Sequence, residues 1–236
     1  MGDGLYVGMA AATARTQQLD AVADNLANAQ TPGFQQTTPA FQTFLSLERN
    51  AQMASVAAVD TGLDVKPGQR TETGRALDLA PSEDQWFSVR LSDGSPGFTR
   101  AGNVLVDARG VLTVAGHSLL NPDGNAISIP PGTTPTFGAD GTVYVRGQVM
   151  DIVATHRLDG PLTRGAPSVV TLAEGAHSAL SAGGVRVGEL MMGNSSTLDA
   201  AVQLVTVQRQ FETAMQAIQT YRHMDTSATE LGRVRG

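Results

Sequence analysis

Cysteine is absent from this chain of 236 residues, which excludes disulfides and thiolate metal sites. Basic residues are also few, because 16 Lys and Arg face 22 Asp and Glu, giving a net charge of −6. They form no basic run, and neutralising phosphates needs clustered Lys and Arg. The composition therefore excludes nucleic acid as the main partner. An apolar fraction of 41% is still compatible with a folded protein.

Long apolar runs are missing as well. No stretch approaches the roughly 20 apolar residues that span a bilayer, so we expect no direct membrane insertion. Residues 1–14 contain neither a basic leader nor an unbroken apolar core, which argues against export through the general secretory route.

Catalytic and cofactor motifs are not found. The four histidines are scattered and none has the spacing of a metal site. Ser88 and Ser118 lack the context of a nucleophile elbow, and no glycine-rich phosphate loop occurs. Asp64 and Asp78 lie in polar sequence, where carboxylates normally cap turns. We therefore predict a non-enzymatic protein without catalytic, cofactor or metal residues.

A heptad pattern runs through residues 1–30, which hold no proline and no glycine after Gly8. Apolar or small residues follow one another in steps of four and three, a spacing typical of a coiled-coil helix. The helix should end near Asn28, because Pro32 disfavours helix at the residue before it. The residues at these heptad positions, which we call the N-terminal seam, are Leu5, Met9, Ala12, Thr16, Leu19, Ala23 and Leu26.

A second seam occupies residues 195–236. Ser195 or Ser196 is expected to cap this helix, with Asp199 in the first turn, where the helix dipole favours negative charge. Three further apolar residues are expected to widen the seam, so that the helix contacts more than one neighbour. The seam residues are Leu204, Val207, Phe211, Ala214, Ile218 and Tyr221, and the widening residues are Leu198, Val202 and Val205.

Short apolar runs separated by turn signals fill the middle of the chain. Residues 86–91 alternate in polarity, and residues 104–106 and 111–114 flank a turn at 107–110, as in an antiparallel β domain. Residues 127–129 and 143–145 are further candidate strands. Residues 40–49 are compatible with either a short helix or an extended arm.

These patterns predict an α+β fold in which the two chain ends form a helical coiled coil and a β-rich domain lies between them. The expected divisions are an assembly helix at 1–34, a linker or arm at 35–80, a β-rich domain at 81–187 and an assembly helix at 195–236. A single helix of this length is marginal alone in water, so each helix needs a partner. Further copies that join head to tail without closing would build a filament. In a generic protein, however, such a helix packs on its own β domain.

Residues 23–34 resemble the N-terminal signature of the flagellar rod and hook family, with Asp24 in place of the family's first Asn. Residues 73–80, 98–103 and 107–112 are similar to three further family motifs, and residues 208–212 resemble its C-terminal helix. Residues 81–87 depart from the family's glycine-rich turn. The matching signature positions are Asn25, Leu26, Ala27, Asn28, Thr31, Gly33, Phe34, Gln208 and Arg209.

This resemblance implies a structural subunit of the bacterial flagellar basal-body rod, the shaft that spans the periplasm and serves motility. The short chain favours a rod protein over a hook protein, and the R-Q-F-E form at 209–212 favours the proximal-rod member. Implied partners are other rod subunits, further copies of the chain and the type III export apparatus, with export that needs no cleaved signal peptide. The termini are expected to fold when they dock during self-assembly.

Alternatives remain at this point. The chain could be a distal-rod or hook-type subunit, a secreted β-sheet binding module with a groove in residues 81–187, or a cell-wall hydrolase. Asn25 and Asn28 could end the helix or could form hydrogen bonds between subunits. The residues expected to pack subunits together are Leu5, Leu19, Leu26, Leu204, Val207, Phe211, Ile218 and Tyr221.

Overall fold

The computed structural model describes residues 2–46, 53–82, 84–181 and 183–234, with side chains placed for 9–38, 62–82, 84–181, 183–220 and 222–224. The chain forms two compact units. We call residues 1–27, 37–62 and 196–236 the helical unit, and residues 28–36 and 63–195 the β unit.

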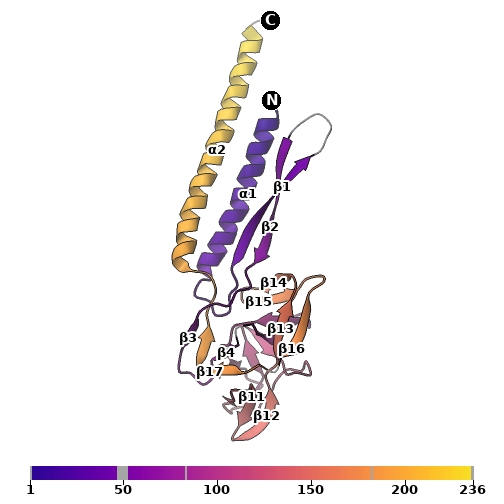
Figure 1. Cartoon of the computed structure of the whole chain (residues 1–236). Coiled ribbons are helices and arrows are strands. Elements are labelled where there is room, and N and C mark those ends of the chain that lie inside the picture. Colours follow the sequence, from indigo (N-terminus) through magenta and orange to yellow (C-terminus); the bar gives the residue numbers. More distant parts are fainter. Residues whose placement is uncertain (1, 47–52, 83, 182, 235–236) are drawn as a thin grey trace. The chain divides into compact units, whose positions relative to one another are not determined.

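The helical unit consists of two helices and a pair of strands. Helices α1 (Gly2–Ala27) and α2 (Thr197–Val234) pack side by side and run in opposite directions (Figure 1). Strands β1 (Thr37–Ser46) and β2 (Met53–Leu63) pair with each other, and β1 contacts α1. The predicted architecture, in which helices from both chain ends pair and flank a β-rich region, is confirmed. No helix in the described residues is long and apolar enough to cross a bilayer.

Local sequence signals set the start of α2 and the end of α1. The Oγ of Ser196 accepts a hydrogen bond from the backbone N–H of Asp199 (3.3 Å), so Ser196 is the N-cap of α2. After α1, the backbone N–H of Thr31 donates to the carbonyl of Asn28 (2.9 Å).

Residues 40–46 are extended within β1, whereas residues 47–49 lie outside the described part of the chain.

The β unit is built from antiparallel pairs. Its largest sheet has the order β14-β15-β6-β5-β9-β8-β7, and β13 pairs with both β5 and β16. Smaller sheets are β10-β11-β12, β17-β4 and β18-β3. The strands are β3 (Arg70–Glu72), β4 (Leu79–Pro81), β5 (Trp86–Arg90), β6 (Pro96–Thr99), β7 (Leu105–Val106), β8 (Leu112–Val114), β9 (His117–Leu119), β10 (Thr136–Phe137), β11 (Thr142–Val145), β12 (Gln148–Ile152), β13 (Thr155–Asp159), β14 (Leu162–Ala166), β15 (Val169–Leu172), β16 (His177–Ser181), β17 (Val185–Val187) and β18 (Glu189–Met191).

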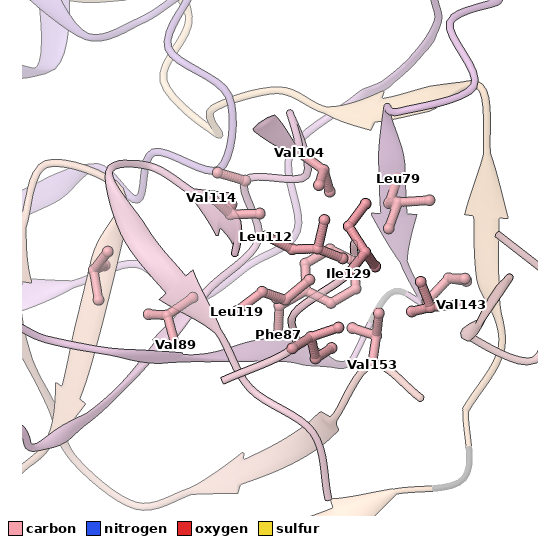
Figure 2. Packing of buried hydrophobic residues seen from close by; sticks show 14 of the residues in the cluster. Leu79, Phe87, Val89, Val104, Leu112, Val114, Leu119, Ile129, Val143 and Val153 are labelled. Carbon is pink, nitrogen blue, oxygen red and sulfur yellow. The ribbon is translucent and has the colours of Figure 1, made fainter. Parts of the chain in front are cut away.

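The larger of two apolar clusters forms the main core of this unit. Its side chains come from segments far apart in sequence and point toward one another (Figure 2). Burial of this apolar surface is the main stabilising contribution, at roughly 25 cal/mol per Å². The cluster includes Leu79, Phe87, Val89, Val104, Leu112, Val114, Leu119, Ile129, Val143 and Val153.

The predicted hairpin between residues 104 and 114 is confirmed. Strands β7 and β8 pair with Leu105 opposite Thr113. The Asp107 carboxylate accepts hydrogen bonds from the backbone N–H groups of Arg109 and Val111, both at 2.8 Å. An Asp side chain that bonds to backbone groups ahead of it is a common way to fix a turn.

The strand predicted at residues 86–91 is confirmed as β5, whereas the strand predicted at residues 127–129 needs correction. Residues 86–91 alternate in sequence, but the first four residues of β5 are all buried, because Phe87 and Val89 enter the main core while Trp86 packs in a second cluster. Residues 127–129 form an isolated bridge between Ser128 and Val111 instead of a strand.

Candidate assembly surfaces

One side of α2 is covered within the chain. Val207 is 3% exposed and Ile218 is also buried, while Leu204, Phe211 and Ala214 are half-buried. These residues follow the predicted spacing of three and four and therefore share one side of the helix. The side chain of Tyr221, which belongs to the same seam, lies outside the described residues.

The opposite side of α2 carries apolar residues that nothing in the helical unit covers. Leu198 is 74% exposed, Val202 60% and Val205 50%. With 3.6 residues per turn, these three lie about 180° around the helix from Val207. The prediction that they widen the seam is therefore wrong in its geometry, since they form a separate stripe. We call Leu198, Val202 and Val205 the outer stripe.

Helix α1 turns a different side inward than its heptad pattern suggests. Ala14 and Val22 are buried, whereas the seam positions Met9, Thr16 and Ala23 are exposed. Leu19 and Leu26 are half-buried, and the side chain of Leu5 lies outside the described residues. Contacts with both α2 and β1 decide which side of α1 is covered, and the heptad pattern alone contains no information about β1.

The side chain of Asn25 forms hydrogen bonds within the chain. Its side-chain amide donates to the carbonyl of Thr37, and its side-chain oxygen accepts from the N–H of Thr37, both at 2.8 Å. The residue is buried, so this pair fixes the start of β1 against the end of α1. At the neighbouring turn, the Oγ of Thr31 donates to the side-chain oxygen of Asn28 (3.4 Å). Both asparagines therefore have local structural roles, and Ala27 is exposed at the end of α1.

The end of the N-terminal signature is buried in the β unit. Phe34 is fully buried, and the guanidinium carbon of Arg164 lies 4.6 Å from the centre of its ring. Gly33 has a φ of +70° and donates its N–H to the carbonyl of Met191 (2.9 Å). A Cβ at Gly33 would overlap the backbone nitrogen of Ala101, so glycine is needed here for both conformation and space.

Asn194 joins three chain segments of the β unit. Its side-chain oxygen accepts from the N–H of Gln36 (2.6 Å), and its amide donates to the carbonyls of Asp64 (2.7 Å) and Lys66 (3.1 Å). The backbone N–H of Asn194 donates to the carbonyl of Phe34 (3.1 Å). The segments around residues 34–36, 64–66 and 194 therefore meet at one polar hub. Sequence reasoning did not find Asn194, because no local spacing marks it.

Arg100 connects this hub to the second apolar cluster. It is almost fully buried, donates to the carbonyl of Val65 (2.6 Å) and to the side-chain oxygen of Gln35 (3.3 Å), and stacks 3.9 Å from the ring centre of Trp86. Burial lowers the pKa of Arg100 to about 10, against the opposing effect of Asp84 and Asp64. The guanidinium therefore stays charged at neutral pH and acts as a structural cation.

The motif at residues 73–80 encloses a buried carboxylate. Arg75 donates two hydrogen bonds to Asp78 (2.7 and 2.8 Å), and the Oγ of Thr73 donates a third (2.6 Å). Burial alone would raise the pKa of Asp78, but these hydrogen bonds and the charge of Arg75 outweigh it and hold the pKa below its usual value. The motif is thus a folded turn that orders the chain beside β4.

The C-terminal signature residues Gln208 and Arg209 are exposed on α2. In the described part of the chain, no group of three or more His, Asp or Glu side chains is placed to hold a metal ion. The helical unit instead presents an apolar stripe on α2 and a partly exposed seam on α1. Exposed apolar side chains of this kind support contacts between proteins.

Comparison with known protein families agrees with this arrangement. Three family models match successive parts of the chain. "Flagella basal body rod protein" matches residues 5–35, "Flagellar hook protein FlgE/F/G D1 domain" matches 83–145, and "Flagellar basal body rod FlgEFG protein C-terminal" matches 188–231. The chain belongs to the flagellar basal-body rod protein family. The predicted family is confirmed, and with it the prediction of a structural, non-enzymatic protein.

Individual members of the rod family show how far the similarity extends. The chain is 40% identical to the flagellar basal-body rod protein FlgF of Salmonella typhimurium and 39% identical to FlgF of Escherichia coli, in each case over 61% of this chain and 57% of the relative. These alignments thus span little more than half of each relative. FlgF of Mesorhizobium japonicum is 29% identical over 98% of this chain and 99% of its own length.

Proposed function

We propose that this chain is a structural subunit of the flagellar basal-body rod, of the FlgF type in the proximal rod, and that it polymerises through its terminal helices. The observation that carries the proposal is the outer stripe left uncovered on α2, where Leu198, Val202 and Val205 are each at least half exposed. Monomeric proteins rarely expose contiguous apolar patches of this kind without a partner. Other rod subunits and further copies of the chain would cover them.

A rod subunit transmits torque through rigidity, and the chain offers two sources of it. The helical unit packs α1 between α2 and β1, and the hub at Asn194 ties together three segments of the β unit. Each hydrogen bond of that hub adds about 1 kcal/mol, and several that share one residue make local deformation costly. No chemistry at a site is required for this role.

The route to the rod is part of the same proposal. The subunit would leave the cell through the flagellar type III export apparatus, without a cleaved signal peptide, and would join the tip of the growing rod. Its packing residues would be the seam positions Leu5, Leu19, Leu26, Leu204, Val207, Phe211, Ile218 and Tyr221. Partial exposure of Leu19, Leu26, Leu204 and Phe211 in the single chain leaves them able to contact a neighbour.

A Leu204→Asp, Phe211→Asp double variant tests the proposal in the native bacterium. Burying two unpaired carboxylates in a helix interface is strongly unfavourable, so rods should be truncated or absent and swimming lost. The measurement is swimming in soft agar together with electron microscopy of isolated basal bodies.

The matched control is Gln203→Asp, Gln210→Asp, which adds the same charge at two exposed positions of α2. This control should swim normally. Normal rods in the Leu204→Asp, Phe211→Asp strain, at normal protein level, would contradict polymerisation through the helical seam.

A further inference from the structure

We propose that the outer stripe of α2 docks into the groove between α1 and α2 of a second copy of this chain. The proposal rests on the proposed function above and specifies which two surfaces of the helical unit meet.

The stripe is suited to insert into another protein. Its three side chains are large, apolar and at least half exposed, and they follow the spacing of 198, 202 and 205 that places residues on one side of a helix. They lie opposite the side of α2 that is covered within the chain, so the contact with α1 can stay intact while the stripe is engaged.

The groove is suited to receive such side chains. It has a volume of about 390 Å³ and continues the interface between the two helices. Met9 and Met215 at its rim are exposed, and methionine adapts its shape to different neighbours. Side chains of a third helix inserted between two others make knobs-into-holes contacts. The groove is lined by Met9, Ala12, Thr13, Met215, Ile218 and Arg222.

Charge and position both favour a second copy as the occupant. Asp199 is exposed next to the stripe and Arg222 lines the groove, so the two surfaces carry charges of opposite sign. Met215 follows Val205 by ten residues, or about 15 Å along α2. Each copy can therefore insert its stripe into one neighbour and receive the stripe of another. Such a head-to-tail contact extends into an open chain if the rotation does not close a ring.

The experiment uses the absence of cysteine from the natural chain. A Met9→Cys, Val202→Cys double variant is expressed in place of the natural protein, and isolated basal bodies are treated with a mild oxidant. If the stripe of one copy occupies the groove of the next, disulfides link successive copies. A non-reducing gel should then show a ladder of dimers, trimers and larger species that collapses on reduction.

Each single variant, Met9→Cys or Val202→Cys, should give no ladder. The matched control is Gln17→Cys, Val202→Cys, which places the first cysteine at another exposed position of α1, about 12 Å further along the helix. Disulfide dimers from Val202→Cys alone would mean that stripes pair with each other, which would overturn the proposal.

Other outcomes separate this inference from the proposed function. A motile strain whose double variant gives no ladder, or gives no more than the control pair, would overturn the docking while leaving the rod subunit intact. Absence of the natural protein from purified basal bodies would overturn both. If the Met9 pair fails to assemble, the pair Leu198→Cys, Met215→Cys applies the same test, and failure of both to form ladders in assembled rods counts against the docking.

Discussion

The two units differ in how completely they cover their own apolar side chains. In the β unit, Phe87, Leu112 and Leu119 are at most 1% exposed, and strands from several sheets surround them. In the helical unit, α1 contacts α2 and β1, and the outer stripe on α2 stays open to solvent. The β unit therefore covers its apolar core, whereas the helical unit leaves apolar side chains exposed, and we propose that neighbouring subunits cover them.

The largest expected loss of stability comes from a mutation in the closed core of the β unit. Phe87→Ala should lower the free energy of unfolding by about 3–5 kcal/mol, because it removes a buried ring and leaves a cavity. Val149→Ala, at an exposed position of β12, should change it by less than about 0.5 kcal/mol. Urea denaturation followed by fluorescence of Trp86, the single tryptophan of the chain, reports on the β unit. Equal effects of the two variants would contradict the description of a closed core.

Two glycines with similar backbone angles separate conformational strain from steric overlap. Gly74→Ala meets no atom within 4 Å and should cost only the strain of a φ near +68°, about 1–2 kcal/mol. Gly33→Ala adds an overlap with the backbone of Ala101, worth a further cost of about 1–3 kcal/mol. The same urea titration measures both. A Gly33→Ala variant no less stable than Gly74→Ala would show that this part of the signature is loosely packed.

The buried carboxylate of Asp78 predicts a dependence of stability on pH. Its pKa in the folded chain lies below the value of about 3.9 for an unfolded Asp, so its contribution is present above that pH and is lost as pH falls through the folded pKa. At pH 7, Asp78→Asn should cost about 1–3 kcal/mol, because it weakens hydrogen bonds to a charged group. The cost should shrink below pH 4.

Urea titrations between pH 7 and pH 3 check this prediction, with Glu174→Gln as the exposed control. A cost for Asp78→Asn that stays constant across this range would show that the carboxylate charge does not stabilise the fold.

The smallest expected difference in stability is between mutations on the covered side and on the exposed side of α2. Val207→Ala removes a buried side chain and should lower helical stability by about 1–3 kcal/mol, whereas Val205→Ala should change it by less than about 0.5 kcal/mol. Circular dichroism at 222 nm during thermal unfolding of the purified chain measures both. In a motility assay, the proposed docking predicts that Val205→Ala reduces swimming. Equal thermal effects would contradict the assignment of a covered and an open side.

Features fixed by neighbouring residues could be predicted from the sequence. The two terminal helices, the cap at Ser196 and the hairpin turn at Asp107 all depend on residues within a few positions of one another. The covered side of α2 could also be predicted, because it is the side that carries the heptad pattern.

Features that depend on distant segments could not be predicted. The covered side of α1 is set partly by β1, and Asn194 acquires its role from partners more than 120 residues away. Trp86 and Phe87 are both buried because β5 lies between two apolar clusters, which an alternating pattern does not reveal. Residues 40–49 illustrate the same limit, since neither a helix nor an extended arm was favoured by local composition.

The most direct test of the central claim is the reactivity of a cysteine in the outer stripe before and after assembly. A Val202→Cys variant should react rapidly with a maleimide reagent as a purified chain and should be strongly protected in isolated basal bodies. A Val89→Cys control, in the closed core, should be protected in both. Equal labelling of Val202→Cys in the free chain and in assembled rods would contradict the claim that neighbouring subunits cover the open side of the helical unit.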